Sequence, residues 1–120
     1  GDYCYLPLLA YIGAVPVWAE LRTADGDAAR GTVEALAAIV SELRRRCPHA
    51  RIVLRGDSGF CREELMAWCE ANRVDYLFGL ARNGRLVRAI GRELREAAQE
   101  ARRTGRPARR FRPHGVDRTT

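Results

Sequence analysis

The chain has 120 residues, 47% of them hydrophobic and 30% charged, a composition typical of one small globular domain rather than of a disordered or fibrous chain. No apolar stretch approaches the roughly 20 residues of a membrane-spanning helix, and no secretion signal is recognisable, so we expect a cytoplasmic protein without a membrane partner. The chain begins at Gly1 and enters a strand-like pattern at once, so we also expect it to be an internal piece of a longer protein.

The net charge of +6 is unevenly distributed along the chain. Residues 1–81 carry nine arginines against eleven acidic residues, whereas residues 82–120 carry twelve arginines against four. A basic segment of this kind is expected to face a polyanion. A solvated helix face, in a chain that uses arginine and no lysine, explains the same counts, so both interpretations stay open here.

Residues 3–12 are apolar at both alternating positions, which predicts a strand buried on both sides, with a bulge or an unpaired side at Pro7. A short turn at Gly13-Ala14 follows, and residues 15–23 alternate apolar and mixed positions. This pattern predicts a hairpin whose second strand has one buried face. That face consists of Val15, Val17, Ala19 and Leu21.

Three helices are predicted after a polar loop at residues 24–31. Thr32 is expected to cap the first helix, which has apolar residues at spacings of three and four, three arginines near its end, and Pro48 to stop it. The second, at about residues 62–72, is expected to bury Leu65, Trp68 and Cys69. The third, at about residues 85–103, is expected to bury Val87, Ile90, Leu94, Ala97, Ala98 and Ala101.

Short apolar runs at residues 52–54 and 74–80 predict two further strands, so the order of elements is β-β-α-β-α-β-α. This order indicates an α/β fold with a mixed sheet and helices packed on it. From Thr104 onward the sequence has no periodicity and many helix breakers, so we expect an irregular basic tail.

Most residue patterns that mark common sites are absent. The four cysteines form no C-x-x-C pair and lie at no zinc-ligand spacing from a histidine, so we expect small core side chains rather than zinc ligands or disulfides. Neither G-x-x-x-x-G-K nor G-x-G-x-x-G occurs, and Ser58 lacks a G-x-S-x-G context, which disfavours a serine hydrolase.

Asp57 is the residue best placed to carry chemistry. It follows a short apolar strand directly and precedes a turn into a helix, and side chains at the carboxyl ends of strands in β-α-β units point into the crevice where ligands bind. A carboxylate there suits a hard cation such as Mg²⁺. The alternative is that Asp57 or Ser58 merely caps the helix that begins near residue 62.

A family resemblance favours the metal-binding interpretation. Residues 51–83 resemble the segment around the second catalytic aspartate of bacterial insertion-sequence transposases, DDE-type enzymes with an RNase H-like fold; the matching string is RIVLRGDSGFCREELMAWCEANRVDYLFGLARN. The string YCYLPL at residues 3–8 and the loop at residues 21–31 are similar to this family too. The resemblance therefore implies a partial DDE catalytic domain at residues 1–103, with an incomplete RNase H-like mixed sheet, followed by a basic tail at residues 104–120.

The resemblance also implies a mechanism. In this family two aspartates and one glutamate hold two divalent ions, Mg²⁺ or Mn²⁺, about 3.5–4 Å apart, and the ions promote cleavage and joining of DNA strands. Asp57 would be the second of the three carboxylates, and the other two lie outside this chain. We therefore expect the isolated chain to be catalytically inactive.

A second expectation concerns arginines at spacings of three and four, which form one helical stripe; they are Arg82, Arg85, Arg88 and Arg92, continued by Arg95. The resemblance implies that they contact the phosphates of DNA at transposon ends. A solvated helix face remains the alternative. Two further interpretations of the whole chain are a non-catalytic DNA-binding remnant and a functionless degraded reading frame that aggregates through an apolar sheet edge.

Overall fold

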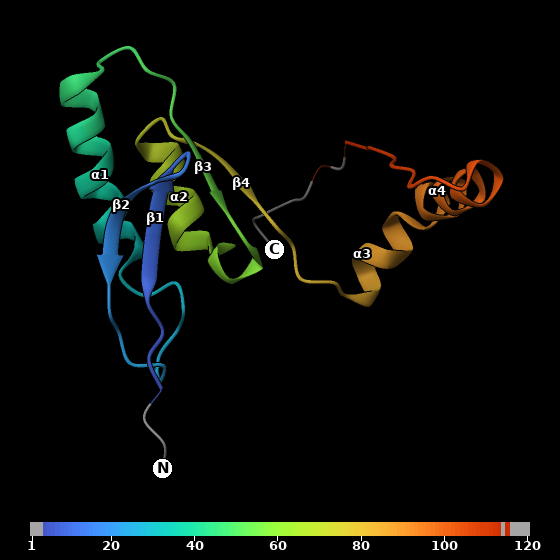
Figure 1. Ribbon diagram of the computed structural model, residues 1–120, viewed down its shortest axis with the longest axis horizontal. Helices are drawn as coiled ribbons and strands as arrows, with labels where there is room; N and C mark the ends of the chain where they lie inside the picture. The colour runs from blue at the N-terminus through green and yellow to red at the C-terminus, as the bar shows by residue number, and fades with distance from the viewer. Residues whose placement is uncertain (1–3, 114, 116–120) are drawn as a thin grey trace. The chain divides into compact units, whose positions relative to one another are not determined.

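The computed structural model describes residues 4–113 and 115, and the chain divides into two compact units, residues 1–80 and 81–120 (Figure 1). The first unit contains β1 (Leu8–Ile12), β2 (Val15–Glu20), α1 (Thr32–Arg46), β3 (Val53–Gly56), the 3-10 turn η1 (Ser58–Phe60), α2 (Glu63–Ala71) and β4 (Asp75–Phe78). The second contains α3 (Gly84–Ala89) and α4 (Gly91–Thr104). This order confirms the predicted elements, except that the last predicted helix is divided in two.

Strands β1 and β2 form an antiparallel hairpin around a turn in which Gly13 has a φ of 59°. The register shifts between Ala10 and Tyr11, where Tyr11 lies opposite Pro16. Proline has no N–H to donate to a ladder, which accounts for the irregularity here. Pro7 lies outside the ladder, between the bridge of Tyr5 with Thr23 and the start of β1, in agreement with the unpaired position predicted for it.

The predicted burial of this hairpin is wrong on both strands. Leu8 is 4% exposed, but Tyr11 on the same strand is 57% exposed and Leu21, just beyond β2, is 70% exposed. On β2 the half-buried residue is Trp18 rather than the valines. Helix α1 packs against β2, and a single covering layer buries at most one face of a sheet.

Strands β3 and β4 are parallel, with Val53 opposite Asp75 and Gly56 opposite Phe78, and α2 makes the crossover between them. Within the described ranges, neither strand of the hairpin pairs with β3 or β4, so the strands form two two-stranded sheets. The predicted single mixed sheet is therefore corrected: β1 and β3 each use one edge for pairing and leave the other edge unpaired.

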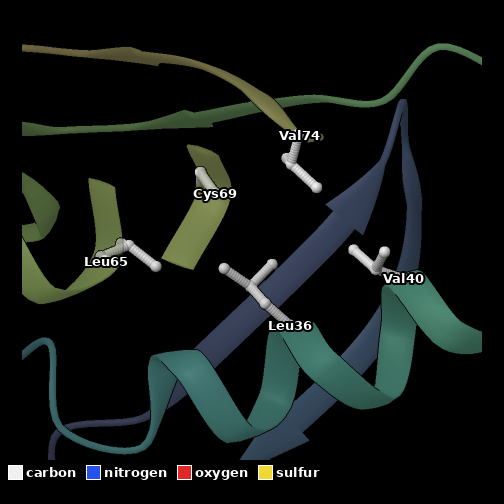
Figure 2. Close-up of a cluster of buried hydrophobic side chains, with 5 residues drawn as sticks. All are labelled: Leu36, Val40, Leu65, Cys69 and Val74. Carbon is white, nitrogen blue, oxygen red and sulfur yellow. The ribbon is translucent and has the colours of Figure 1, made fainter. Parts of the chain in front are cut away.

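The core of the first unit lies between α1, α2 and the β3–β4 sheet. Figure 2 shows Leu36 and Val40 from α1 directed toward Leu65 and Cys69 from α2, with Val74 ahead of β4 beside them. Side chains of both parallel strands pack against this cluster. The predicted burial of Leu65 and Cys69 is confirmed, whereas Trp68 is half-buried.

Two further predictions need correction. Thr32 does not cap α1: Gly31 holds the N-cap position with a φ of 80°, and the buried Thr32 hydroxyl has no hydrogen-bond partner among the described residues. All four cysteines are free, but Cys69 alone is buried, while Cys4 and Cys47 are exposed. The expectation that the cysteines are small core side chains is therefore confirmed fully for Cys69 alone.

In the second unit, the predicted helix at residues 85–103 is interrupted at Ile90, which has φ −106° and ψ 15°. Ile90 is β-branched and Gly91 is a poor helix former, so the chain bends where these two adjoin. The predicted burial is wrong, since neither helix contains a buried residue and Leu94 is 48% exposed. After Gly105, the described part of the tail contains no helix or strand, as predicted.

Candidate functional site

Asp57 lies directly after β3, in extended backbone with φ −79° and ψ −173°, and its side chain is exposed. Its Oδ1 accepts a hydrogen bond of 2.8 Å from the N–H of Gly59, and its carbonyl oxygen accepts one of 3.2 Å from the N–H of Phe60. Backbone and side chain are thereby held together in one tight turn. The carboxylate is thus fixed in position while its surface stays open to solvent.

These hydrogen bonds show which element Asp57 caps. Asp57 caps the short turn η1, whereas α2 has Arg62 at its N-cap position and no side-chain cap. The cap uses one carboxylate oxygen, and Oδ2 has no hydrogen-bond partner among the described residues. Capping and ligand binding are therefore compatible roles for the same side chain.

Three glycines allow the backbone to close around Asp57. A Cβ on Gly56 would lie 3.1 Å from the Cβ of Phe60 and 3.2 Å from the ring of Phe78. A Cβ on Gly79 would lie 3.3 Å from the backbone nitrogen of Ser58, and one on Gly59 would lie 3.0 Å from Oδ1 of Asp57. A Cβ at these positions would be crowded and its neighbours would have to shift by a few tenths of an ångström, so the glycines favour the observed position of the carboxylate.

A groove of about 680 Å³ ends at this turn. It is lined by residues 8–11 of β1, by Trp18 of β2, by residues 53–57 at β3, and by Thr32, Ala35, Leu36 and Ile39 of α1. Sequence reasoning missed the groove and also missed Arg55, an exposed residue that lines it together with Asp57. The signal was present, because residues two apart on a strand share a face.

The described residues supply no complete metal site. Nowhere in residues 4–113 do three or more His, Cys, Asp or Glu side chains gather closely enough to hold a metal ion. Two other aspartates of the unit are ion-paired: Asp75 with Arg51 at 2.6 Å, and Asp27 with Arg62 at 3.2 Å, where the guanidinium lowers the pKa of Asp27. A metal ion held by Asp57 would need ligands beyond the described residues.

The predicted arginine stripe is not carried by one continuous helix. Arg82 precedes α3, Arg85 and Arg88 lie on α3, and Arg92 lies in the first turn of α4, where it bonds Glu96 at 2.8 Å. All four side chains are exposed. They belong to the unit of residues 81–120, and Asp57 belongs to the unit of residues 1–80.

Every described carboxylate of the second unit has an arginine partner. Glu93 pairs with Arg112 at 3.4 Å, and Arg110 in the tail pairs with both Glu96 and Glu100. A hydrogen bond from the Arg92 guanidinium lowers the pKa of Glu96. This leaves eight arginines without a carboxylate partner in the described part of the unit: Arg82, Arg85, Arg88, Arg95, Arg102, Arg103, Arg106 and Arg109.

The chain thus has an aspartate at the end of a strand, in a glycine-rich turn, followed along the sequence by a strongly basic segment. The chain matches the family described as transposase DDE domain group 1 over residues 1–115, and it belongs to this family. The match extends beyond the end of the predicted domain at residue 103 and includes part of the tail. Comparison with curated proteins and with solved structures found no match. No helix in the described ranges is long and apolar enough to cross a membrane.

Proposed function

We propose that this chain is the part of a DDE transposase that contributes one metal-binding carboxylate, Asp57, to a site that cleaves and joins DNA strands. The observation that carries the proposal is the position of this carboxylate at the carboxyl end of a parallel strand, exposed, with one oxygen bonded to a backbone N–H and the other without a partner among the described residues. Family membership supplies the reaction class.

The chain's own contribution is to position this ligand. The turn around Asp57 is held by two backbone N–H groups and by glycines at which a Cβ would be crowded, so its carboxylate loses little freedom when it binds a cation. Asp57 would hold one of two divalent ions, Mg²⁺ or Mn²⁺, which together would supply activation of the attacking oxygen and stabilisation of the leaving oxygen in phosphoryl transfer. Because the described residues offer a single such ligand, no catalytic step is assigned to this chain alone.

The remaining parts of the proposal follow from the family. The complete fold is RNase H-like, the two other carboxylates lie outside this chain, the partner is DNA at transposon ends, and the site of action is the bacterial cytoplasm. Because two of the three carboxylates are missing from it, the isolated chain is inactive in strand cleavage. The domain boundary at residues 103–104 stays a prediction.

Paramagnetic relaxation by Mn²⁺ tests the metal-binding role. We expect Mn²⁺ to broaden the amide signals of residues 57–60 in the chain, and Asp57→Asn to abolish this broadening. Asp75→Asn is the matched control, since it removes the same charge at the opposite end of the parallel sheet. Broadening that survives Asp57→Asn, or that is lost equally in Asp75→Asn, contradicts the proposal.

A second candidate function is DNA binding without catalysis. Its support is the charge of the second unit, where each described carboxylate is paired and eight arginines are left without a carboxylate partner. This binding depends on salt, and each lost phosphate contact reduces the slope of log K against log salt by about 1. We expect that reduction in Arg88→Gln and not in the control Arg45→Gln, which lies in the first unit beside Glu42. A pure phosphate binder is also indifferent to Asp57→Asn, which distinguishes it from the first proposal.

A further inference from the structure

Arg55 and Asp57 lie on one face of the β3–β4 sheet, the face that is not covered by the core. Leu54 and Phe78 pack against the buried cluster of the first unit, so the alternate side chains of both strands point away from it. Arg55 is exposed, and so is Leu77, which lies opposite it in the parallel register. Asp57 continues the extended backbone of β3 and is exposed too. The two charged side chains therefore share this face, with their Cα atoms about 6.6 Å apart at the usual rise of a strand.

Arg55 is the single cation in the described lining of the groove beside Asp57. The charged residues of this groove of about 680 Å³ are Arg55 and Asp57, and its other lining residues are neutral. Among the described residues the Arg55 side chain has neither an ion pair nor a hydrogen bond, although Asp57 is two positions away. A guanidinium group has five N–H donors and no acceptor. The described residues therefore leave all five donors of Arg55 to a ligand in the groove.

Neighbouring arginines of this unit are used by the fold. Arg51, ahead of β3, bonds Asp75 at 2.6 Å, and Arg62, ahead of α2, bonds Asp27 at 3.2 Å. These contacts join segments that are 24 and 35 residues apart in the sequence. Arg55 joins no such segments, so the packing of the described unit gives no reason for a guanidinium group at this position.

We infer that Arg55 binds a phosphate group of the DNA strand on which Asp57 acts, through two parallel N–H···O bonds from its guanidinium. This planar fork matches two oxygens of one phosphate, which adds both strength and orientation to the contact. Contacts of this kind fix the position of a strand without reading its sequence. The inference rests on the proposed function, because it takes the ligand of the groove to be the strand brought to Asp57.

The charges of the groove explain why a cation is needed beside Asp57. A DNA strand carries one negative charge per phosphate, so the Asp57 carboxylate alone repels it. At a separation of about 6.6 Å in water this repulsion lowers the affinity about threefold. Arg55 offsets the repulsion, and a divalent cation on Asp57 would make the two side chains together net positive. We therefore expect phosphate binding at Arg55 without a metal ion, and tighter binding with one.

The test uses a dinucleotide with one phosphodiester, thymidylyl-(3′→5′)-thymidine, added to the 120-residue chain in EDTA. The measurement is ¹⁵N NMR of the arginine Nε–H groups and of the backbone amides. We expect the Nε–H signal of Arg55 and the amide signals of residues 55–57 to shift together, with a single Kd. The Nε–H signal of Arg51 should not move, because that group already donates to Asp75. Inorganic phosphate at the same concentration is the second arm, since it separates a strand contact from a site for a free anion.

Variants provide a second readout, the Kd obtained from the amides of residues 56 and 57. Arg55→Gln removes the charge and should raise this Kd about tenfold, the change expected when a hydrogen bond to a charged group is lost. Arg55→Lys keeps the charge but not the fork and should raise the Kd about threefold. Arg51→Gln is the matched control, since it removes the same charge ahead of the same strand, and it should leave the Kd within about twofold. If a variant does not fold, as judged from its amide spectrum, the Nε–H signal of Arg55 in the parent chain still decides.

Mg²⁺ and Asp57→Asn distinguish a failure of this inference from a failure of the proposed function. In EDTA, Asp57→Asn should lower the Kd of the dinucleotide about threefold, because the repulsion is removed. Mg²⁺ should lower the Kd for the parent chain and not for Asp57→Asn. A contact at Arg55 that is indifferent to Mg²⁺ contradicts the metal role of Asp57 and still supports Arg55 as the phosphate ligand.

Three results would overturn the inference. The first is the absence of any shift of the Arg55 Nε–H signal up to the solubility limit of the dinucleotide. The second is a Kd that rises equally in Arg55→Gln and Arg51→Gln, which assigns the binding to the general charge of the unit. The third is a shift caused by inorganic phosphate and not by the dinucleotide, which assigns Arg55 to a free anion rather than to a DNA strand.

Discussion

Replacing Asp57 by alanine and by asparagine separates its structural role from its proposed ligand role. Alanine removes the hydrogen bond of 2.8 Å that Oδ1 accepts from Gly59, the cap of η1. Loss of a side-chain cap costs about 0.5–2 kcal/mol, and because this cap is exposed and closes a single turn we expect about 1 kcal/mol. In a unit of this size, that loss lowers the Tm by about 4–8 °C. Asparagine keeps an acceptor oxygen at the same place, so we expect Asp57→Asn to stay within about 0.5 kcal/mol of the parent chain.

Thermal unfolding of the parent chain and both variants is followed by far-UV circular dichroism, with Mg²⁺ and with EDTA. These measurements give the stability contributed by the cap and the stabilisation by Mg²⁺. Mg²⁺ at ten times its Kd should stabilise the parent chain by about 1.4 kcal/mol and should stabilise neither variant. The reasoning about the cap is refuted if Asp57→Asn is as unstable as Asp57→Ala, since the lost hydrogen bond cannot then be the cause. The ligand role is refuted if Mg²⁺ stabilises Asp57→Asn as much as the parent chain.

Three further predictions concern the rest of the chain. Leu65→Ala, at a position 2% exposed in the core, should cost about 2–5 kcal/mol, most of the stability of a small unit, as measured by urea unfolding. Hydrogen bonds from Arg45 and Arg46 lower the pKa of Glu42 from 4.5 to about 2. The stability from this contact is therefore present above pH 4.5 and is lost as the pH falls toward 2. An NMR titration of Glu42 measures this pKa, and added salt should reduce the shift. Arg110→Glu should release the tail from α4 and speed its cleavage by trypsin, whereas Arg109→Glu, without an ion-pair partner in the described part of the unit, should not.

The elements that could be predicted are those with short-range signals. Helix α1 ends where three arginines and Pro48 indicate, with the N–H of Cys47 bonded to the carbonyl of Leu43 at 2.7 Å. The spacing of Leu65 and Cys69 on α2 correctly gives its buried face, because residues four apart lie one above the other on a helix. Capping was less predictable, since Gly31 in the left-handed region takes the position that we assigned to Thr32.

The predictions that failed depend on what covers each element. The apolar residues of β1 predicted burial on both faces, but burial requires a layer on each side, and the sequence of a strand does not specify its neighbours. The same reason explains Leu94, which has the spacing of a buried position on a helix that has no buried residue. Pairing of strands is equally non-local, so the sequence predicted one mixed sheet where residues 4–113 form two.

The errors about the hairpin and the sheet concern the same part of the structure, the unpaired edges of β1 and β3. Leu9 and Tyr11 lie on the free edge of β1, and Val53 lies on the free edge of β3; all three line the groove and all three are exposed. The sequence pattern of β1 is thus typical of a strand covered on both faces, whereas Leu9 and Tyr11 are exposed. Asp57 could be predicted because its position depends on a local turn, but the groove beside it depends on two strands about 45 residues apart in the chain.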